Sequence, residues 1–444
     1  MKNWAESYEF SSDHFLYPEN ARQVQEICKD KTYRYIKAVG TRHSFTEIAD
    51  TMKVPKDVSQ KMTTAHVCLE KMQKIYFGHE PLEKRPVVTF EAGVTFTNLA
   101  YAVEKAGYAL QNMASLPHIG VIGAVITATH GSGHKYPIMA KNIVAMDIVH
   151  ADGQLVTYDR SMPDFAHYLI NFGALGIIVN ATMLLEPNYH VAKGIYRNLS
   201  WDTLHSKFDE IMTSADNVNM FTDWKEPRFT SVWIGQRYDP KGKKLDIPAE
   251  FFGAKHIKEK AIHPDGVHEP VNCTTVGHGS WVVKSCHFLP EGKPSSGGKE
   301  MQIEYYLPYK NFLPALMRLY KMRDVFVDLV DVTEVRMMAK DDLPMSQAKD
   351  EAVIGIHWTM KFDHTAKNLA EIKAVAPKIE AALAEFGAKP HYGKWFEFCG
   401  HAFEKMYGAD LLKLRQLMHK HDPAGRFHNA FVDKYILNRK LAKL

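Results

Sequence analysis

Two short segments in the C-terminal half of the sequence carry charged and polar side chains at the spacing of a β-strand. In residues 332–338, Glu334 and Arg336 are two positions apart, so strand alternation places both on one face. In residues 353–360, His357 and Thr359 share a face with a glycine, whereas the alternate positions are large and apolar. If both segments are strands, one face of each can pack in a core while the other face lines a polar site. From the residues alone, a solvated surface is the competing interpretation.

Two turn-rich segments in the N-terminal half could bind an anionic group through backbone N–H donors. Residues 38–44 and 115–133 are rich in glycine and small side chains, which let backbone approach a pyrophosphate closely. Neither matches G-x-x-x-x-G-K-[ST] or a strand-linked G-x-G-x-x-G, which disfavours a P-loop ATPase and a Rossmann dehydrogenase. Ordinary turns that bind no ligand are the competing interpretation of both segments. The first segment contains His43, for which a purely structural role is the alternative to a role in ligand binding.

The composition is that of a globular protein of two or three domains. The chain has 444 residues, of which 45% are hydrophobic, and a formal net charge of +4 without a dense basic stripe. This charge pattern argues against a nucleic-acid partner. The five cysteines are widely spaced and form no C-x-x-C pair, which argues against a disulfide framework and a zinc site and favours a reducing compartment.

The two ends of the sequence bear on its location. Residues 1–6 contain no apolar signal core, and no run of about 18 uncharged apolar residues occurs. We therefore expect a cytoplasmic protein without a membrane partner. The chain ends in Ala442-Lys443-Leu444, a variant of the S-K-L address, so a peroxisomal location is the alternative if the source is eukaryotic.

Hydrophobic periodicity predicts the elements that position these residues. Residues 87–93 read as a strand, a helix follows from Phe96 to a glycine stop at Gly107, and Asp152-Gly153 joins 143–149 and 155–158 in a hairpin. After residue 190 the strands lengthen. Two later helices, 312–322 and 366–386, should cover a sheet with the stripes Leu313, Leu316, Met317, Tyr320 and Leu369, Ile372, Val375, Ile379, Leu383.

Nine motifs taken together resemble one family. They are G-T-R-H-S-F (40–45), N-M-A-S-L-P-H-I-G-V-I-G-A-V (112–125), T-A-T-H-G-S-G (127–133), F-G-A-L-G-I-I (172–178), F-T-D-W (221–224), V-N-C-T (271–274), E-V-R (334–336), P-H-Y-G-K (390–394) and D-P-A-G-R-F (422–427). The sequence resembles FAD-linked oxidases of the vanillyl-alcohol-oxidase type and, more narrowly, the alditol (xylitol) oxidases, with sugar-lactone oxidases more distant. This implies an α+β fold: an FAD-binding (PCMH-like) domain at 1–189, a cap domain of antiparallel sheet plus helices at 190–408, and a segment 409–444 that returns to the FAD domain.

The resemblance implies FAD attached covalently through His43, whose ring nitrogen would bond the flavin 8α-methyl carbon. Such a link fixes the flavin and raises its potential. The chain departs from the family at Arg42, where many relatives have glycine, and at Gly120, where serine is usual. The implied FAD contacts are Ala38, Val39, Gly40, Thr41, Arg42, His43, Ser44, Ser115, Gly120, Gly123, Thr127, Ala128, Thr129, His130 and Ile178.

The resemblance also implies a polyol substrate. Ser115, Glu334, Arg336, Thr359 and Lys394 match residues that bind the polyol in alditol oxidases, with His357 beside them. Arg336 and Lys394 would stabilise the developing alkoxide, and the proton acceptor is left open between Lys394 and His357, so these three are the catalytic candidates. The expected reaction oxidises a terminal hydroxyl of xylitol or sorbitol to the aldose and reduces O₂ to H₂O₂.

Three other functions compete. A polyol dehydrogenase of the same fold would use another electron acceptor, and Ala114 lies where such proteins can gate oxygen. A sugar-1,4-lactone oxidase fits the E-V-R, H-W-T and P-H-Y-G-K set less well. A non-catalytic carbohydrate- or metal-binding protein would have His419, His421 and Asp422 as candidate ligands, although a helix end there favours a solvated turn. We expect a monomer without a metal site.

Overall fold

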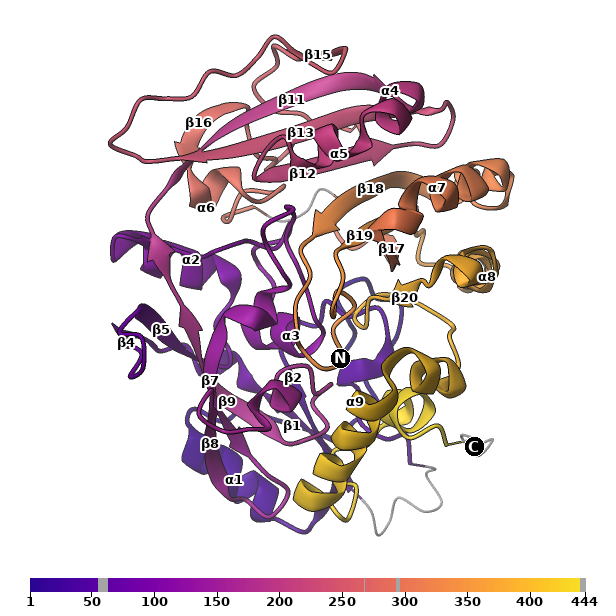
Figure 1. The fold of residues 1–444 in the computed structure, drawn as a ribbon. Coiled ribbons are helices and arrows are strands. Elements are labelled where there is room, and N and C mark those ends of the chain that lie inside the picture. The colour runs from indigo at the N-terminus through magenta and orange to yellow at the C-terminus, as the bar shows by residue number, and fades with distance from the viewer. Residues whose placement is uncertain (55–62, 267, 293–295, 440–444) are drawn as a thin grey trace.

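The described N-terminal part of the protein builds two small sheets, a two-stranded pair and three helices (Figure 1). The structure is a computed structural model that describes residues 1–54, 63–266, 268–292 and 296–439, so the C-terminal Ala442-Lys443-Leu444 lies outside the described residues. A three-stranded parallel sheet has the order β1-β3-β2, and a five-stranded antiparallel sheet has the order β4-β5-β9-β7-β8. The elements are β1 (His14–Leu16), α1 (Ala21–Lys29), β2 (Tyr33–Val39), β3 (Thr63–Cys68), β4 (Ile75–His79), β5 (Pro86–Glu91), α2 (Phe96–Lys105), α3 (Val121–Ile126), β7 (Ile143–Val149), β8 (Leu155–Asp159) and β9 (Ile177–Leu184), with β6 (Tyr108–Ala109) paired to β10 (Glu186–Pro187).

Local sequence signals account for several of these elements. Helix α2 begins where the Thr95 hydroxyl accepts a hydrogen bond from the Asn98 N–H at 3.3 Å, and the chain leaves it through Gly107 at φ +84°. The β7–β8 hairpin turns at Gly153, where φ is +82° and a Cβ would lie 2.9 Å from the Gln25 carbonyl oxygen. The predicted helix and hairpin are confirmed.

The second half of the chain forms one large antiparallel sheet. Its ten strands follow the order β14-β15-β11-β13-β12-β18-β19-β17-β20, with β16 paired to β11 (Figure 1). The strands are β11 (His190–Ser200), β12 (Asn217–Thr222), β13 (Arg228–Tyr238), β14 (Glu250–Phe251), β15 (Ala254–His256), β16 (Gly277–Ser280), β17 (Glu300–Pro308), β18 (Val330–Met338), β19 (Val353–Lys361) and β20 (Lys389–Pro390). The expected α+β class and antiparallel cap sheet are confirmed.

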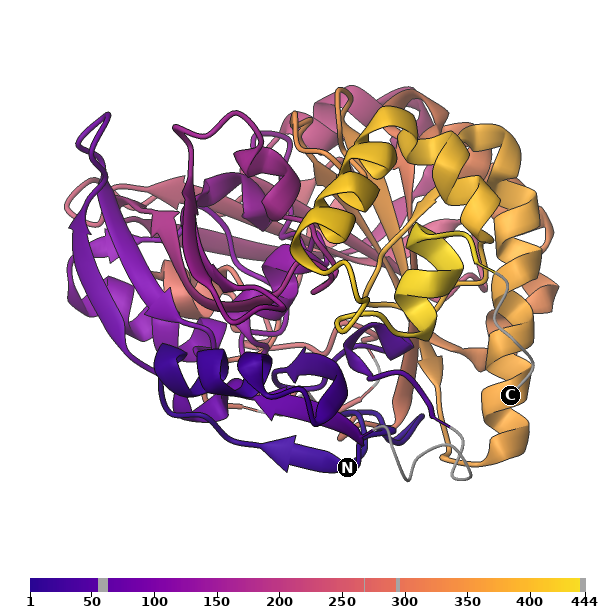
Figure 2. The ribbon, with the colours of Figure 1, turned by 90° about the horizontal axis from the view of Figure 1, so that it is seen from below.

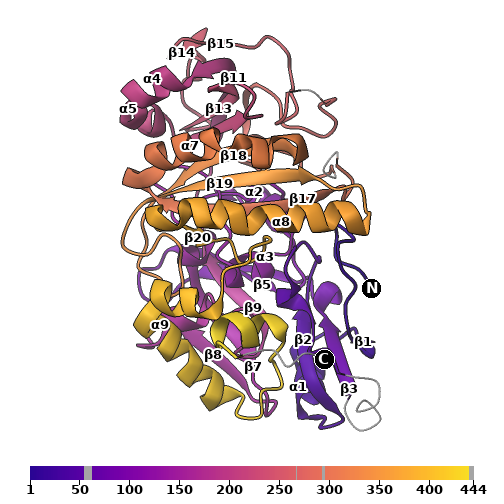
Figure 3. The ribbon, with the colours of Figure 1, turned by 90° about the vertical axis from the view of Figure 1, so that its right-hand side faces the viewer.

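Helices cover one face of this sheet. Figures 1 and 3 show α7 (Phe312–Lys321) and α8 (Ala366–Leu383) along the same face, and Trp201 of α4 (Trp201–Ser206) packs on Tyr320 of α7. Helix α5 (Phe208–Thr213) is anchored there by Phe208 against Phe312, whereas α6 (Trp281–Lys284) packs beside β11. The remaining short helical turns are η1 (Glu47–Ala49), η2 (Leu69–Lys71), η3 (Met139–Asn142), η4 (Phe165–Tyr168), η5 (Tyr309–Asn311), η6 (Arg323–Val325), η7 (Val327–Leu329) and η8 (Ala384–Phe386).

The buried stripe of α7 differs from the predicted one. The core-facing side chains are Phe312, Ala315, Leu316 and Leu319, and Met317, which was placed in the stripe, is 41% exposed. The prediction is confirmed for Leu316, and Leu313 and Tyr320 are partly buried against the core, so the predicted stripe is wrong at Met317. In α8 the predicted stripe is confirmed for Ile372, Val375, Ile379 and Leu383, and Leu369 is partly buried.

The C-terminal segment packs between the N-terminal sheets and α8 (Figure 2). Helix α9 (Gly400–His421) is interrupted at Gly408 with φ +43°, and the π-helical turn η9 (Val432–Ile436) follows. Helix α9 begins ahead of residue 409, where the C-terminal segment was expected to start, and the domain limits stay predictions. No helix within the described ranges combines the length and apolarity that a membrane span needs.

The end of α9 is partly buried, because His421 and Asp422 pack on the N-terminal domain while His419 is exposed. The His421 ring stacks on His150 with centroids 3.9 Å apart and its Nε2 lies 2.9 Å from the Tyr168 hydroxyl. The Asp422 carboxylate is 2% exposed and accepts hydrogen bonds from the N–H groups of Arg426 and Phe427. The solvated turn expected for His419, His421 and Asp422 is therefore wrong except at His419, because the segment returns to the N-terminal domain.

The Arg426 side chain holds the C-terminal segment on the N-terminal domain by hydrogen bonds to backbone carbonyls. Its side chain is 5% exposed, and the guanidinium donates to the carbonyl oxygens of Ala151 at 2.8 Å and Tyr33 at 2.9 Å. It also donates to the carbonyls of Cys28 and Asp30. Because each of these oxygens is acceptor-only, removing the arginine would leave several buried carbonyls without a donor.

We expect Arg426→Ala to lower the free energy of unfolding by about 3 kcal/mol, the cost of stranding several buried carbonyls. Urea unfolding followed by circular dichroism measures the change. Arg439→Ala is the control, because that side chain is 61% exposed and makes one ion pair with Asp433 at 3.7 Å, so its effect should stay within about 0.5 kcal/mol. Equal losses in the two variants would contradict the structural role of Arg426.

Candidate active site

Three neighbouring strands of the large sheet present rows of polar side chains toward the N-terminal domain. Strand register sets the rows, because β18 pairs with β19 and β19 with β17 in fixed antiparallel alignment. Across the three strands the rows are Val332, Thr359 and Gln302; then Glu334, His357 and Glu304; then Arg336, Gly355 and Tyr306. The predicted common face of Glu334 and Arg336 is confirmed, and the apolar positions Ile354, Ile356, Trp358 and Met360 belong to the main core.

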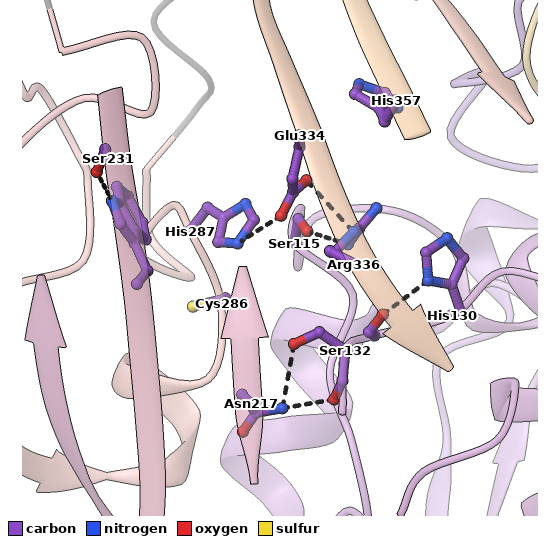
Figure 4. Close-up of polar contacts among 12 residues, drawn as sticks. Ser115, His130, Ser132, Asn217, Ser231, Cys286, His287, Glu334, Arg336 and His357 are labelled. Carbon is purple, nitrogen blue, oxygen red and sulfur yellow. Dashed lines mark hydrogen bonds and ion pairs between the residues drawn. The ribbon is translucent and has the colours of Figure 1, made fainter. Parts of the chain in front are cut away.

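Arg336 lies at the centre of these rows and reaches across to the N-terminal domain. Its Nη1 donates to the Ser115 hydroxyl at 2.7 Å. Its Nε lies 3.4 Å from Glu334 Oε2, and its Nη2 lies 3.5 Å from Glu304 Oε1. Figure 4 shows Ser115, Glu334 and Arg336 converging on one point. The buried guanidinium is thus compensated by two carboxylates from two different strands.

Glu304 is a central residue that the sequence interpretation missed. It is 1% exposed, and its carboxylate lies 2.8 Å from His130 Nε2 and 3.0 Å from His357 Nδ1. Burial raises the pKa of Glu304, but the charge and hydrogen bond of His130 and those of His357 hold it well below its ordinary value. The signal for it was present, since Glu300, Gln302 and Glu304 alternate with apolar residues in β17.

Glu334 is the second buried carboxylate of the site. Figure 4 shows it between Arg336 and His287, whose Nε2 lies 3.3 Å from Glu334 Oε1. Burial raises the pKa of Glu334 to about 7, although Arg336 opposes this shift. Oε1 of Glu334 accepts no hydrogen bond from any described residue. His287, which sequence analysis missed, comes from the loop after α6 and is held by its N–H to the Ser115 carbonyl at 3.1 Å.

The two candidate proton acceptors have different environments. Burial lowers the pKa of Lys394 to about 8, Glu304 and Glu300 oppose that shift, and Arg336 lowers the pKa further. The expected influence of Arg336 is thus present but secondary to desolvation. The Lys394 ammonium donates to the Gln302 side-chain carbonyl. Burial lowers the pKa of His357 to about 4 and the Glu304 contact opposes it, so the ring is neutral at pH 7.

Two cavities meet at this cluster. The outer one has a volume of about 310 Å³, and its walls include all the predicted polyol-binding residues together with His357. The inner one runs along the turn-rich segments of the N-terminal domain. The residues that line both cavities are Ser115, Leu116, Gln302, Arg336 and Lys394. A ligand in the outer cavity would therefore lie next to the end of a ligand in the inner cavity, at the residues that line both.

The inner cavity brings together most of the residues expected to bind FAD. Its lining includes Ala38, Val39, Gly40, Thr41, Arg42, His43, Ser44, Ser115, Gly120, Gly123, Thr127, Thr129 and His130. Two expected contacts, Ala128 and Ile178, do not line it. Ala128 is fully buried in a turn with φ +55°, and Ile178 pairs with Ile148 inside the five-stranded sheet. Their motif positions match the family, but their side chains belong to the core.

His43 faces the inner cavity as a neutral ring. It stacks on Trp4 with centroids 4.8 Å apart and lies 4.8 Å from the His118 ring. Burial, followed by His118, Lys394 and Arg42, holds the pKa of His43 well below its ordinary value, so a ring nitrogen keeps its lone pair at neutral pH. Such a nitrogen can act as a nucleophile.

The two departures from the family pattern have local explanations. Arg42 has φ +64°, in the left-handed region that favours the glycine of many relatives, and its carbonyl accepts the Trp4 N–H at 2.8 Å. Gly120 N–H donates to the Thr41 hydroxyl at 3.0 Å. A hydroxyl is thus present beside Gly120, supplied by Thr41 rather than by a serine.

Two groups of described residues have side-chain geometry compatible with a metal ion. They are His130 with Glu304 and His391, and His263 with Asp265 and His268. In the first group His130 is already hydrogen-bonded to Glu304, and His391 Nδ1 accepts the Gly393 N–H at 3.0 Å. The expectation of no metal site stays a prediction.

Two family models match the chain. A model described as an FAD binding domain matches residues 12–159, and one described as D-arabinono-1,4-lactone oxidase matches residues 299–435. The first covers most of the turn-rich segments of the inner cavity, and the second covers the strands that carry Glu304, Glu334, Arg336 and His357. The inner cavity, with its backbone-lined loops, fits an FAD cofactor.

Relatives that align over nearly the whole chain are oxidases. An alditol oxidase from Streptomyces sp. (strain IKD472 / FERM P-14339) is 30% identical over 97% of this chain and 98% of its own. An L-gulonolactone oxidase from Mus musculus is 24% identical over 98% and 97%, respectively. The crystal structure of cholesterol oxidase from B. sterolicum superposes with a TM-score of 0.72 at 13% identity over 97% of this chain and 95% of that one, which shows a shared fold.

Gly123 offers a direct test of the inner cavity. A Cβ at this position would meet no protein atom within 4 Å, and the residue lines the cavity. We expect Gly123→Leu to fold normally but to occupy the space that FAD needs, so that the flavin-to-protein absorbance ratio of the purified protein falls sharply. Gly78→Leu is the matched control, because Gly78 is equally unobstructed and lies in the exposed strand β4. Normal flavin content in Gly123→Leu would show that FAD lies elsewhere.

Proposed function

Because the chain belongs to the vanillyl-alcohol-oxidase-type family of FAD-linked oxidoreductases that includes the alditol oxidases, we propose that it oxidises the terminal hydroxyl of an alditol to the aldose. Xylitol and sorbitol are the proposed substrates, and O₂, reduced to H₂O₂, is the proposed acceptor. The proposal is supported chiefly by the outer cavity, whose wall of paired polar groups meets the FAD cavity at Ser115, Arg336 and Lys394.

This wall suits a ligand made of hydroxyl groups. A polyol offers no apolar handle, so recognition depends on matched donors and acceptors, and one missing partner leaves another buried group unpaired. Glu334 Oε1 is a buried acceptor that receives no hydrogen bond from the described residues, although His287 Nε2 lies 3.3 Å away, and a substrate hydroxyl can donate to it. Thr359 and Gln302 belong to the adjacent row of the same three strands and add further polar groups to it.

The residues around the hydroxyl can support its oxidation. Bound FAD supplies the acceptor for the hydride that leaves the carbinol carbon and passes both electrons to O₂. The hydroxyl proton must go to a protein base, for which Lys394 and His357 are the candidates. Arg336 is held by Ser115, Glu334 and Glu304, so its charge is already in place when the oxygen becomes negative. Such preorganised charge commonly provides the largest share of catalysis.

Covalent attachment of FAD through His43 is the second part of the proposal. The neutral ring, its place in the cavity wall and the fixed stacking on Trp4 support it. A bond from a ring nitrogen would hold the flavin against the shared wall without relying on affinity.

A sugar-1,4-lactone oxidase is the alternative function, favoured by the lactone-oxidase model over residues 299–435. A polyol dehydrogenase differs only in its electron acceptor. Peroxide production with each substrate class separates the three functions.

The proposed substrate class is tested by anaerobic addition of xylitol to the yellow protein. We expect the flavin absorbance to bleach, and peroxide to appear when air is admitted. An L-gulono-1,4-lactone addition serves as the comparison. Bleaching by the lactone alone would replace the alditol proposal with the lactone one, and bleaching by xylitol without peroxide would indicate a dehydrogenase.

The covalent link is tested by His43→Ala. Acid precipitation should leave the yellow colour in the pellet for the unaltered protein and release it to the supernatant for the variant, because the nitrogen nucleophile is gone. His118→Ala is the control, since that ring neighbours His43 but is not the proposed attachment point. Release of flavin from the unaltered protein would refute the link.

The role of Arg336 is tested by Arg336→Ala. We expect kcat/KM for xylitol to fall by about two orders of magnitude, the scale of one lost electrostatic group. Arg318→Ala on the exposed face of α7 should leave kcat/KM unchanged. Unchanged kinetics in Arg336→Ala, with normal flavin content, would remove Arg336 from the catalytic set.

A further inference from the structure

We propose that Glu304 is a positioning residue of the oxidation, which holds His357 in the tautomer that accepts the substrate hydroxyl proton. Glu304 would act through His357 rather than on the substrate. The inference rests on the proposed function for its chemistry, although the state of His357 itself can be measured without any substrate.

The contact between Glu304 and His357 fixes where the ring carries its proton. His357 Nδ1 lies 3.0 Å from Glu304 Oε2. A carboxylate can only accept, so Nδ1 must be the N–H of the ring. A neutral imidazole then has its lone pair on Nε2, which lies 3.3 Å from the Thr359 hydroxyl and belongs to the wall of the outer cavity. The basic nitrogen therefore faces the polyol site.

The same reasoning shows that Glu304 is ionised. His130 is hydrogen-bonded at both ring nitrogens, to the Gly131 carbonyl at 2.7 Å and to Glu304 Oε1 at 2.8 Å. A neutral ring has one N–H, so the pair holds an additional proton between His130 and Glu304. Arg336 at 3.5 Å favours that proton on His130, because it stabilises the negative carboxylate. Burial and Arg336 lower the pKa of His130, and the charge and hydrogen bond of Glu304 oppose that shift.

Glu304 Oε2 is the hydrogen-bond partner that the described residues provide for His357 Nδ1. Gly355 of β19 lies between Arg336 of β18 and Tyr306 of β17. A Cβ at Gly355 would lie 3.3 Å from Glu304 Oε1. The glycine lets the carboxylate lie flat against the sheet between its partners. The charged groups that face His357 from neighbouring elements are Glu304, Glu334, Arg336 and Lys394, with the neutral His287 beyond them.

The proposed step balances without a further reactant. The O–H bond of the terminal hydroxyl breaks and its proton passes to His357 Nε2, while the C–H bond breaks and its hydride passes to the cofactor. The ring then carries two N–H groups and a positive charge, which the Glu304 carboxylate stabilises through Nδ1. This arrangement of a carboxylate behind a basic imidazole orients the ring and raises its basicity.

The kinetic test is Glu304→Gln, which keeps a side chain of the same shape and removes the charge. We expect kcat for xylitol to fall about 10- to 100-fold, with a much smaller change in KM. The acid limb of the kcat/KM profile should move to lower pH, because losing the carboxylate lowers the pKa of His357. Glu380→Gln is the matched control: Glu380 is also buried and accepts from the Tyr305 hydroxyl at 2.8 Å and the Glu397 N–H at 2.7 Å, away from both cavities. An unmoved acid limb, or a loss equal to that of the control, would overturn the proposal.

The second measurement observes the unaltered protein and needs no substrate; a variant serves only to assign the signal. Long-range ¹H–¹⁵N correlation spectra of the holoenzyme with labelled histidine, assigned by comparison with His357→Asn, report which ring nitrogen carries the proton. We expect the Nδ1–H tautomer for His357 at pH 7. An Nε2–H tautomer would overturn the role of Glu304 even if xylitol is oxidised, whereas an Nδ1–H ring in a protein inert toward polyols would uphold the positioning and refute only the proposed function.

Discussion

The structure depends on charge buried where the two domains meet. Arg336, Glu304 and Glu334 are each less than 8% exposed, and an unpaired charge at such a place would cost several kcal/mol. Removing Arg336 would take from both carboxylates the cation that they share. Because Ser115 belongs to the N-terminal domain and Arg336 to the sheet, their hydrogen bond at 2.7 Å also sets how the sheet sits against the cofactor cavity.

Strand register makes this charge cluster possible. Each row across β18, β19 and β17 brings together residues that are far apart in the chain, and the opposite faces of the same strands are fixed in the core by Trp358 and its neighbours. A slip of one residue would turn every polar side chain into the core. The apolar face, covered by α7 and α8, therefore determines the position of the polar one (Figure 3).

Sequence reasoning found what is local and missed what register creates. Alternation within one strand was enough to place Glu334 beside Arg336, and motifs were enough to place His43 in the cavity wall. Glu304 and His287 had no visible partner in the sequence, because their contacts with His130 and Glu334 join segments that only the folded chain brings together. The exposed Met317 of α7 and the partly buried His421 have the same cause: packing partners, not local pattern, decide which side chains are covered.

The two carboxylates around Arg336 differ in how firmly they hold their charge. Three donors surround Glu304, so it remains ionised, whereas Glu334 has one oxygen that receives no hydrogen bond from the described residues and a pKa raised by burial to about 7. A polyol hydroxyl that donates to Glu334 Oε1 would stabilise its ionised form and lower that pKa. Substrate binding would then release a proton from Glu334 near neutral pH and complete the negative partner of Arg336 when the hydroxyl is in place. Recognition of the polyol and the charge balance of the site would therefore be set by the same oxygen atom.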